Sequence, residues 1–173
     1  MARYIFTFGL ILAAALSRLL PHPMNVAPIT ALALFGGVYL GKRQAFIIPI
    51  AAMLLSDFFL GFYSGMTWVY GSFIAIVGIG LWLKSQQGIA STFFSSIVGS
   101  ILFFIVTNFG VWISSQVSYP HNFAGLMECY TAAIPFFRNT LVGDLAYVAG
   151  LFGLFELINK FVPDLQLKPI SIK

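Results

Sequence analysis

Long apolar stretches separated by short polar segments dominate this sequence, and they restrict the folds that it can adopt. Hydrophobic residues make up 60% of the 173 residues, charged residues only 8%, and the mean hydropathy is +0.95. A soluble domain carries about 25% charged residues, so this chain lacks the polar side chains to cover a water-facing surface. Disorder is excluded by the same figures, and a disulfide-stapled scaffold by the single cysteine, Cys129. The sequence predicts an all-α integral membrane protein with one domain over residues 1–173.

Six stretches are predicted to be transmembrane helices, because a helix needs about 17–25 apolar residues to cross ~30 Å of hydrocarbon. The second stretch is too short to span without help. Residues 115–139 contain two prolines and several polar residues, and we expect an outer loop with a short helix there. The predicted helices cover residues 4–20, 27–41, 45–62, 67–83, 89–114 and 140–161.

The basic residues predict the orientation, since Lys and Arg accumulate on the cytoplasmic side of a membrane. With six spans and the N-terminus in the cytoplasm, seven of the nine basic residues lie inside and two, Arg18 and Arg138, lie outside. We therefore expect both the N and the C terminus in the cytoplasm. The basic residues are scattered between apolar runs, which argues against nucleic acid as a partner. The seven inner residues are Arg3, Lys42, Arg43, Lys84, Lys160, Lys168 and Lys173.

Polar side chains gather in the predicted outer half of the bundle, although a charge in a membrane span costs at least about 2.5–3.5 kcal/mol. One interpretation is structural: ion pairs hold the helices together. The other is an outward-facing polar pocket in which arginines grip an anionic or carbonyl group of a solute. The two are compatible. The candidate binding residues are Arg18, Asn25, Asp57, Asn108, Arg138, Asn139 and Asp144.

The two outer arginines are predicted to differ in role. Arg18 lies within a span and is expected to pair with Asp57. Arg138 directly precedes the predicted last helix, where Asn139 and free backbone N–H groups would add donors for an anion. We therefore expect Arg138 to contact the ligand. Glu156 lies four residues before Lys160, a spacing that favours a surface ion pair.

Small residues recur every four positions on two predicted helices, a spacing that allows helices to approach closely. Gly9, Ala13 and Ser17 share one face of the first helix, and Gly37 and Gly41 share one face of the second. These faces either pack inside the bundle or dock on a separate membrane protein.

Sequence patterns for catalysis are absent, so we expect the protein not to be an enzyme and to need no cofactor. The chain has no paired-histidine zinc motif, no Gly-x-Ser-x-Gly elbow and no phosphate-binding glycine loop. A metal site from His22, His121, Glu128 and Cys129 is imaginable but follows no ligand motif, and no metal is predicted.

Four segments together resemble an uncharacterised family of small bacterial membrane proteins. They are SRLLPHPMNVAP (residues 17–28), ALALFGG (31–37), AMLLSD (52–57) and AIPFFRNT (133–140). That family is similar in turn to the substrate-binding S components of energy-coupling-factor (ECF) vitamin transporters, through its six helices and its length. The resemblance implies an S-component-like bundle in the bacterial inner membrane, with an outward-opening pocket capped by the loop at residues 21–28.

The resemblance also implies partners. The face formed by Gly9, Ala13 and Ser17 would dock on a transmembrane coupling subunit driven by ATPases. We expect a binding and uptake protein for a small organic solute, a vitamin or a precursor, embedded in the lipid bilayer. The alternatives are a structural or assembly subunit of a larger membrane complex, with no solute of its own, and third an intramembrane enzyme.

Overall fold

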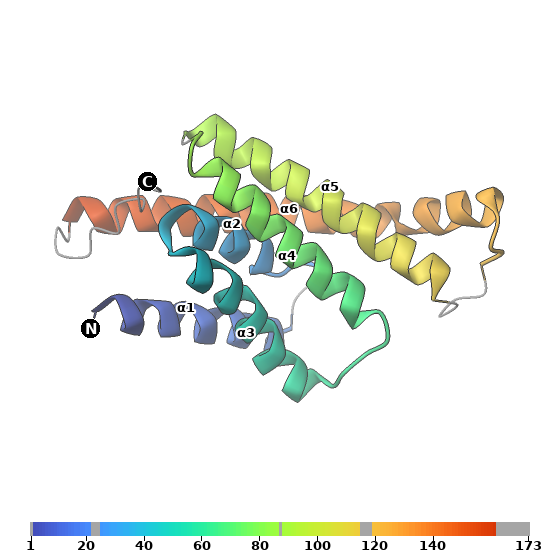
Figure 1. Ribbon diagram of the computed structural model, residues 1–173, viewed down its shortest axis with the longest axis horizontal. Helices are drawn as coiled ribbons and strands as arrows, with labels where there is room; N and C mark the ends of the chain where they lie inside the picture. Colours follow the sequence, from blue (N-terminus) through green and yellow to red (C-terminus); the bar gives the residue numbers. More distant parts are fainter. Residues whose placement is uncertain (1, 22–24, 87, 115–118, 162–173) are drawn as a thin grey trace.

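The computed structural model describes residues 2–21, 25–86, 88–114 and 119–161, and this part of the chain contains six helices and no strand (Figure 1). The predicted all-α class is confirmed for these residues. The helices are α1 (Ala2–Leu19), α2 (Ile29–Tyr39), α3 (Lys42–Leu60), α4 (Met66–Leu83), α5 (Ile89–Ile113) and α6 (Phe123–Phe161).

Four of the described helices, α3, α4, α5 and α6, are long and apolar enough to cross a membrane, judged by length and composition. Helix α2 is apolar but has 11 residues, which makes it about 16 Å long, roughly half of the hydrocarbon thickness. The chain therefore has the helices of a membrane protein. The six-span topology and the cytoplasmic termini stay predictions, and Lys168 and Lys173 lie outside the described residues.

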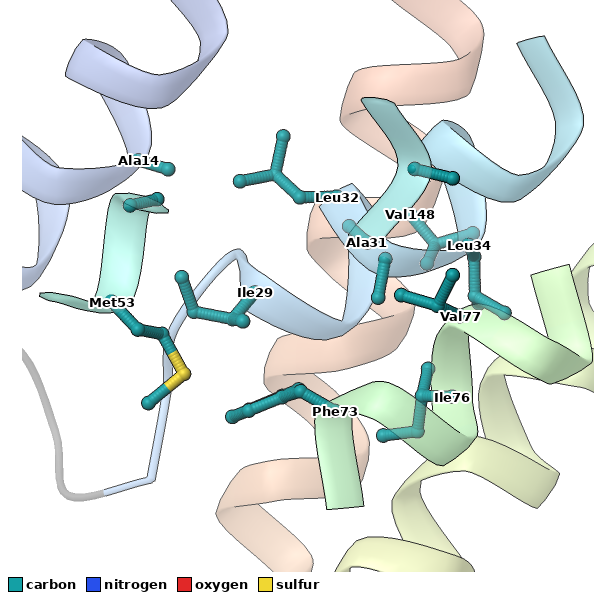
Figure 2. Close-up of a cluster of buried hydrophobic side chains, with 13 residues drawn as sticks. Ala14, Ile29, Ala31, Leu32, Leu34, Met53, Phe73, Ile76, Val77 and Val148 are labelled. Carbon is teal, nitrogen blue, oxygen red and sulfur yellow. The ribbon is translucent and has the colours of Figure 1, made fainter. Parts of the chain in front are cut away.

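Helix α2 forms the centre of the molecule. All 11 of its residues are buried, and it packs against α1, α3, α4, α5 and α6. Figure 2 shows Ile29, Ala31, Leu32 and Leu34 of α2 surrounded by apolar side chains from α1, α3, α4 and α6. A helix that is apolar on every side must be buried, and here the longer helices bury it.

A close crossing of α2 and α4 depends on two glycines. A Cβ atom added to Gly37 would overlap the backbone of Gly80, and one added to Gly80 would lie 2.8 Å from the carbonyl oxygen of Leu34. No side chain fits at either position. The expectation of close helix packing is therefore confirmed for Gly37, while Gly41 precedes the first residue of α3.

Helix α6 is continuous over 39 residues, about 58 Å. The short helix predicted within residues 115–139 is therefore joined to the predicted last helix, and this corrects the predicted start at 140. Residues 115–118 lie outside the described part. The helix begins early because the Asn122 side chain accepts a hydrogen bond of 2.9 Å from the Gly125 N–H group. Pro135 removes one backbone hydrogen bond without ending the helix, which is common in membrane helices.

The end of α5 and the beginning of α6 form a two-helix arm that extends away from the start of α1 and the end of α6 (Figure 1). The Tyr130 hydroxyl donates a 2.7 Å hydrogen bond to the Ile105 carbonyl oxygen, and the Phe104 ring contacts the rings of Tyr130 and Phe137. These contacts hold the two helices together along the arm.

Candidate functional site

A polar cavity of about 280 Å³ lies where the end of α1 meets the beginning of α2 and the middle of α6. Its volume falls near the lower end of the range for small-molecule sites, roughly 300–1,000 Å³. One side of the cavity is apolar, and six polar side chains reach it. The polar residues are Arg18, Asn25, Thr30, Tyr63, Thr140 and Asp144, and the apolar ones are Val26, Ala27, Ile29, Met53, Val69, Phe73 and Phe103.

An ion pair between α1 and α3 neutralises the arginine of this cavity. Arg18 Nη2 lies 2.8 Å from Asp57 Oδ1, and Arg18 Nη1 also donates to Ser56 Oγ. The Tyr70 hydroxyl donates a 2.8 Å hydrogen bond to Asp57 Oδ2. The predicted pairing of Arg18 with Asp57 is confirmed, and the Asp57 side chain is only 1% exposed.

Asp144 has a different environment, although it is also buried, with 3% of its surface exposed. The Ser100 hydroxyl donates a 2.7 Å hydrogen bond to Asp144 Oδ2, and the Thr30 hydroxyl donates to the same carboxyl group. Among the residues that the structure describes, no Lys or Arg lies within ion-pair distance of Asp144. An ionised carboxylate is costly to bury without a cation. The Asp144 carboxyl group is therefore suited either to carry a proton or to bind a ligand that has a cationic or N–H group.

The loops contribute two polar side chains to the cavity. Asn25 adopts a left-handed backbone conformation (φ 65°), which asparagine tolerates better than most residues, and leads the chain from α1 into α2. Tyr63 lies between α3 and α4. Burial raises the pKa of its hydroxyl, Asp57 raises it further and Arg18 lowers it in part, so Tyr63 stays a neutral hydrogen-bonding group at neutral pH.

The structure does not bring all the predicted binding residues together. Arg138 and Asn139 are exposed and line a neighbouring groove of about 490 Å³, not the polar cavity. Asn108 lies on the α5–α6 arm, where its side chain donates to the Phe104 carbonyl oxygen at 2.7 Å. Of the seven candidates, Arg18, Asn25 and Asp144 line the cavity, and Asp57 holds Arg18.

The interpretation of Arg138 needs a correction that follows from the length of α6. Arg138 lies in the interior of this helix and not before its first turn, so the free backbone N–H groups expected beside it are absent. Sequence reasoning also missed the hydroxyl groups of the site, Thr30, Tyr63, Ser100 and Thr140. The spacing of four between Thr140 and Asp144, which places them on one helix face, was a usable signal.

A second, apolar cavity of about 620 Å³ lies at the opposite end of α2, between the end of α4, the beginning of α5 and the last turns of α6. The Tyr39 hydroxyl donates a 2.7 Å hydrogen bond to Glu156 Oε1 at its edge. Glu156 therefore has a partner on α2, in place of the surface ion pair with Lys160 that the sequence suggested. The lining residues are Val38, Tyr39, Leu83, Gly88, Ile89, Thr92, Phe93, Val148, Ala149, Phe152, Gly153 and Glu156.

Two of the three residues on the small-residue face of α1 are exposed, and the third, Ser17, is half-buried and donates to the Ala14 carbonyl oxygen at 2.8 Å. Gly9 and Ala13 are both exposed, and a Cβ atom added to Gly9 would meet no other atom within 4 Å. Ala14 and Ala15, on the other side of the helix, are buried instead. Packing of the Gly9 and Ala13 face inside the described bundle is therefore excluded.

The imagined metal site is not assembled among the described residues, where no three potential ligands come together. His121 packs against Trp112 and the Cys129 thiol donates to the Asn108 carbonyl oxygen at 3.5 Å, while His22 lies outside the described part. The prediction that no metal is needed stays a prediction.

Fold and site together define the class: an all-α protein with membrane-length apolar helices around a polar cavity, whose buried carboxyl group has no cationic partner among the described residues. A family model matches residues 1–165, and the chain belongs to this family, a family of unknown function (DUF6580). Comparisons with curated proteins and with solved structures gave no match.

Proposed function

We propose that this protein binds a small organic solute in its polar cavity and takes part in the uptake of that solute across the bacterial cytoplasmic membrane. The observation that carries the proposal is Asp144, a buried carboxyl group that lines the cavity and has no cationic partner among the described residues. Charged residues inside membrane domains are rare and usually serve a binding or transport function.

The charges of the cavity indicate which solutes fit. The positive charge of Arg18 is already neutralised by Asp57, whereas Asp144 is held only by hydroxyl groups. The site therefore favours a protonated amine or a neutral N–H donor, and not the anion that the two arginines suggested from sequence. Phe73 and Phe103 supply an apolar wall for the carbon framework of the solute.

Uptake needs a source of energy, and the resemblance to S components suggests a coupling subunit with ATPases. The exposed face of α1 leaves room for such a partner beside Gly9 and Ala13. Ala13→Leu is expected to abolish uptake while the solute still binds. Leu19→Ala, at an exposed position about 120° around the helix from Ala13, is the matched control, and equal uptake by both variants would contradict the docking.

The binding proposal is tested by mass spectrometry of small molecules that co-purify with the detergent-solubilised protein. Wild type and Glu128→Gln, which changes an exposed carboxyl group on the α5–α6 arm, should carry the same compound. Asp144→Asn should carry much less of it. If wild type carries no compound and instead retains a stoichiometric protein partner, the chain is a structural subunit and the binding proposal is wrong.

A further inference from the structure

A line of hydroxyl groups runs along one face of α5 between the two cavities. Thr92, Ser96 and Ser100 are spaced by four residues, so they lie above one another on the helix surface. Thr92 lines the apolar cavity, and Ser100 donates to Asp144, which lines the polar cavity. Ser96 lies between them and is fully buried.

Ser96 differs from the other two hydroxyls because its Oγ atom has no hydrogen-bond partner among the described residues. Ser100 Oγ also lies 3.0 Å from the Ser96 carbonyl oxygen, so its single hydrogen is shared between this oxygen and Asp144. Thr92 Oγ1 donates to the Gly88 carbonyl oxygen at 2.9 Å. An unsatisfied buried hydroxyl costs about 1–3 kcal/mol, and such groups in native proteins often serve a function or hold a water molecule.

The two cavities are separated by only one to two helical turns. Thr30 of α2 lines the polar cavity and Val38, eight residues later, lines the apolar one, a rise of about 12 Å. On α6, Asp144 and Val148 line the two cavities one helical turn apart. Consecutive hydroxyls on α5 rise by about 6 Å, a distance that one bridging water spans with two hydrogen bonds.

Few other titratable groups face Asp144. Helices α5 and α2 pack on α6; α5 contains no titratable residue, and the only one on α2, Tyr39, lies at the far end beside Glu156. Across the polar cavity are Arg18, with its partner Asp57, and Tyr63. Asp144 is therefore the one carboxyl group that the described residues place at the polar-cavity end of the hydroxyl line.

We propose that Asp144 binds a proton and exchanges it with the apolar cavity through Ser100, Ser96 and Thr92. The O–H bond of the Asp144 carboxylic acid breaks and leaves a carboxylate. Each hydroxyl, with one water beside it, accepts a proton on its oxygen and passes its own proton onward. The proton reaches water in the apolar cavity, beside the exposed carboxylate of Glu156, and the reverse sequence reloads Asp144.

The test is proton flux into vesicles that contain the purified protein. Sodium-free phosphatidylcholine vesicles enclose a pH-sensitive dye, and valinomycin with a potassium gradient sets the membrane potential. Wild type should transfer protons faster than protein-free vesicles, and Ser96→Ala and Asp144→Asn should fall to the protein-free rate. Ser95→Ala is the matched control: its hydroxyl is also buried without a partner, but it lines a groove between α4 and α5 away from the line.

Two results would overturn the proposal: wild-type vesicles no faster than protein-free ones, or Ser96→Ala as fast as wild type. Infrared spectroscopy gives a second readout that does not depend on a variant of Asp144. A carboxylic acid C=O band at neutral pH, moved to higher frequency by Ser100→Ala, supports the protonated carboxyl group, and no such band contradicts it. No solute is present in either experiment, so their failure leaves the solute-binding proposal standing.

Discussion

Two buried aspartates, Asp144 in the lining of the polar cavity and Asp57 behind Arg18 of that lining, differ in what stabilises them. Asp57 has an arginine at 2.8 Å and a tyrosine hydroxyl on its other oxygen. Asp144 has only hydroxyl donors, Ser100 and Thr30. The comparison teaches that burial alone does not reveal the role of a membrane carboxylate. A paired carboxylate fixes helices, and one without a cation can bind a proton or a ligand.

Removing the arginine of the pair should have the largest effect. Arg18→Gln leaves Asp57 as an uncompensated buried charge, so we expect a loss of about 3–5 kcal/mol in the free energy of unfolding. Thermal unfolding in detergent measures it. The double variant Arg18→Gln/Asp57→Asn should be more stable than Arg18→Gln alone, because it leaves no orphaned charge. Equal stabilities of the two variants would show that the pair does not couple α1 to α3.

Tyr70→Phe should have the next largest effect. It removes the hydroxyl that donates to the charged Asp57, a bond worth about 1.5–3 kcal/mol, and keeps the ring. Urea unfolding of the detergent-solubilised protein gives the difference from wild type. If Tyr70→Phe lowers the free energy of unfolding by less than Ser100→Ala does, hydrogen bonding stabilises Asp57 less than it stabilises Asp144.

Ser100→Ala should destabilise less. The hydroxyl donates to Asp144, and hydrogen bonds between membrane helices contribute about 0.6 kcal/mol on average. If Asp144 were ionised in the empty protein, this bond would be worth as much as the one from Tyr70. The same unfolding assay therefore compares the two carboxyl groups directly, and equal losses would contradict a neutral Asp144.

Asp144→Asn should change stability least, by less than the roughly 0.6 kcal/mol expected for Ser100→Ala, because it leaves no buried cation without a partner among the described residues. Asparagine also keeps the oxygen that accepts from Ser100. The melting temperature should stay near that of wild type while the co-purified solute is lost. A melting temperature as low as that of Arg18→Gln would show that Asp144 has an unrecognised structural partner.

The sequence was sufficient for features that depend on local composition. The charge content indicated the membrane class, and the apolar stretches located five of the six described helices and the second half of α6. They also showed that α2 is too short to span a membrane by itself. The pairing of Arg18 with Asp57 was also predictable, because an isolated charge in a span needs an opposite charge nearby. The match to a family of unknown function agrees with the resemblance to an uncharacterised family, and it does not test the further similarity to S components.

Only the tertiary structure decided which helices pack together and which side chains meet. Burial of α2 on every side requires packing against five other helices, with a close crossing of α4 at Gly37 and Gly80, and hydropathy does not specify a crossing. Helix α6 begins at a first turn capped by Asn122 and continues through Pro135. Arg138 therefore lies in the helix interior and lines a neighbouring groove, not the polar cavity. The contact of Asp144 with Ser100 joins residues 44 positions apart. Such contacts depend on the rotation of each helix about its axis, which packing sets and local sequence does not.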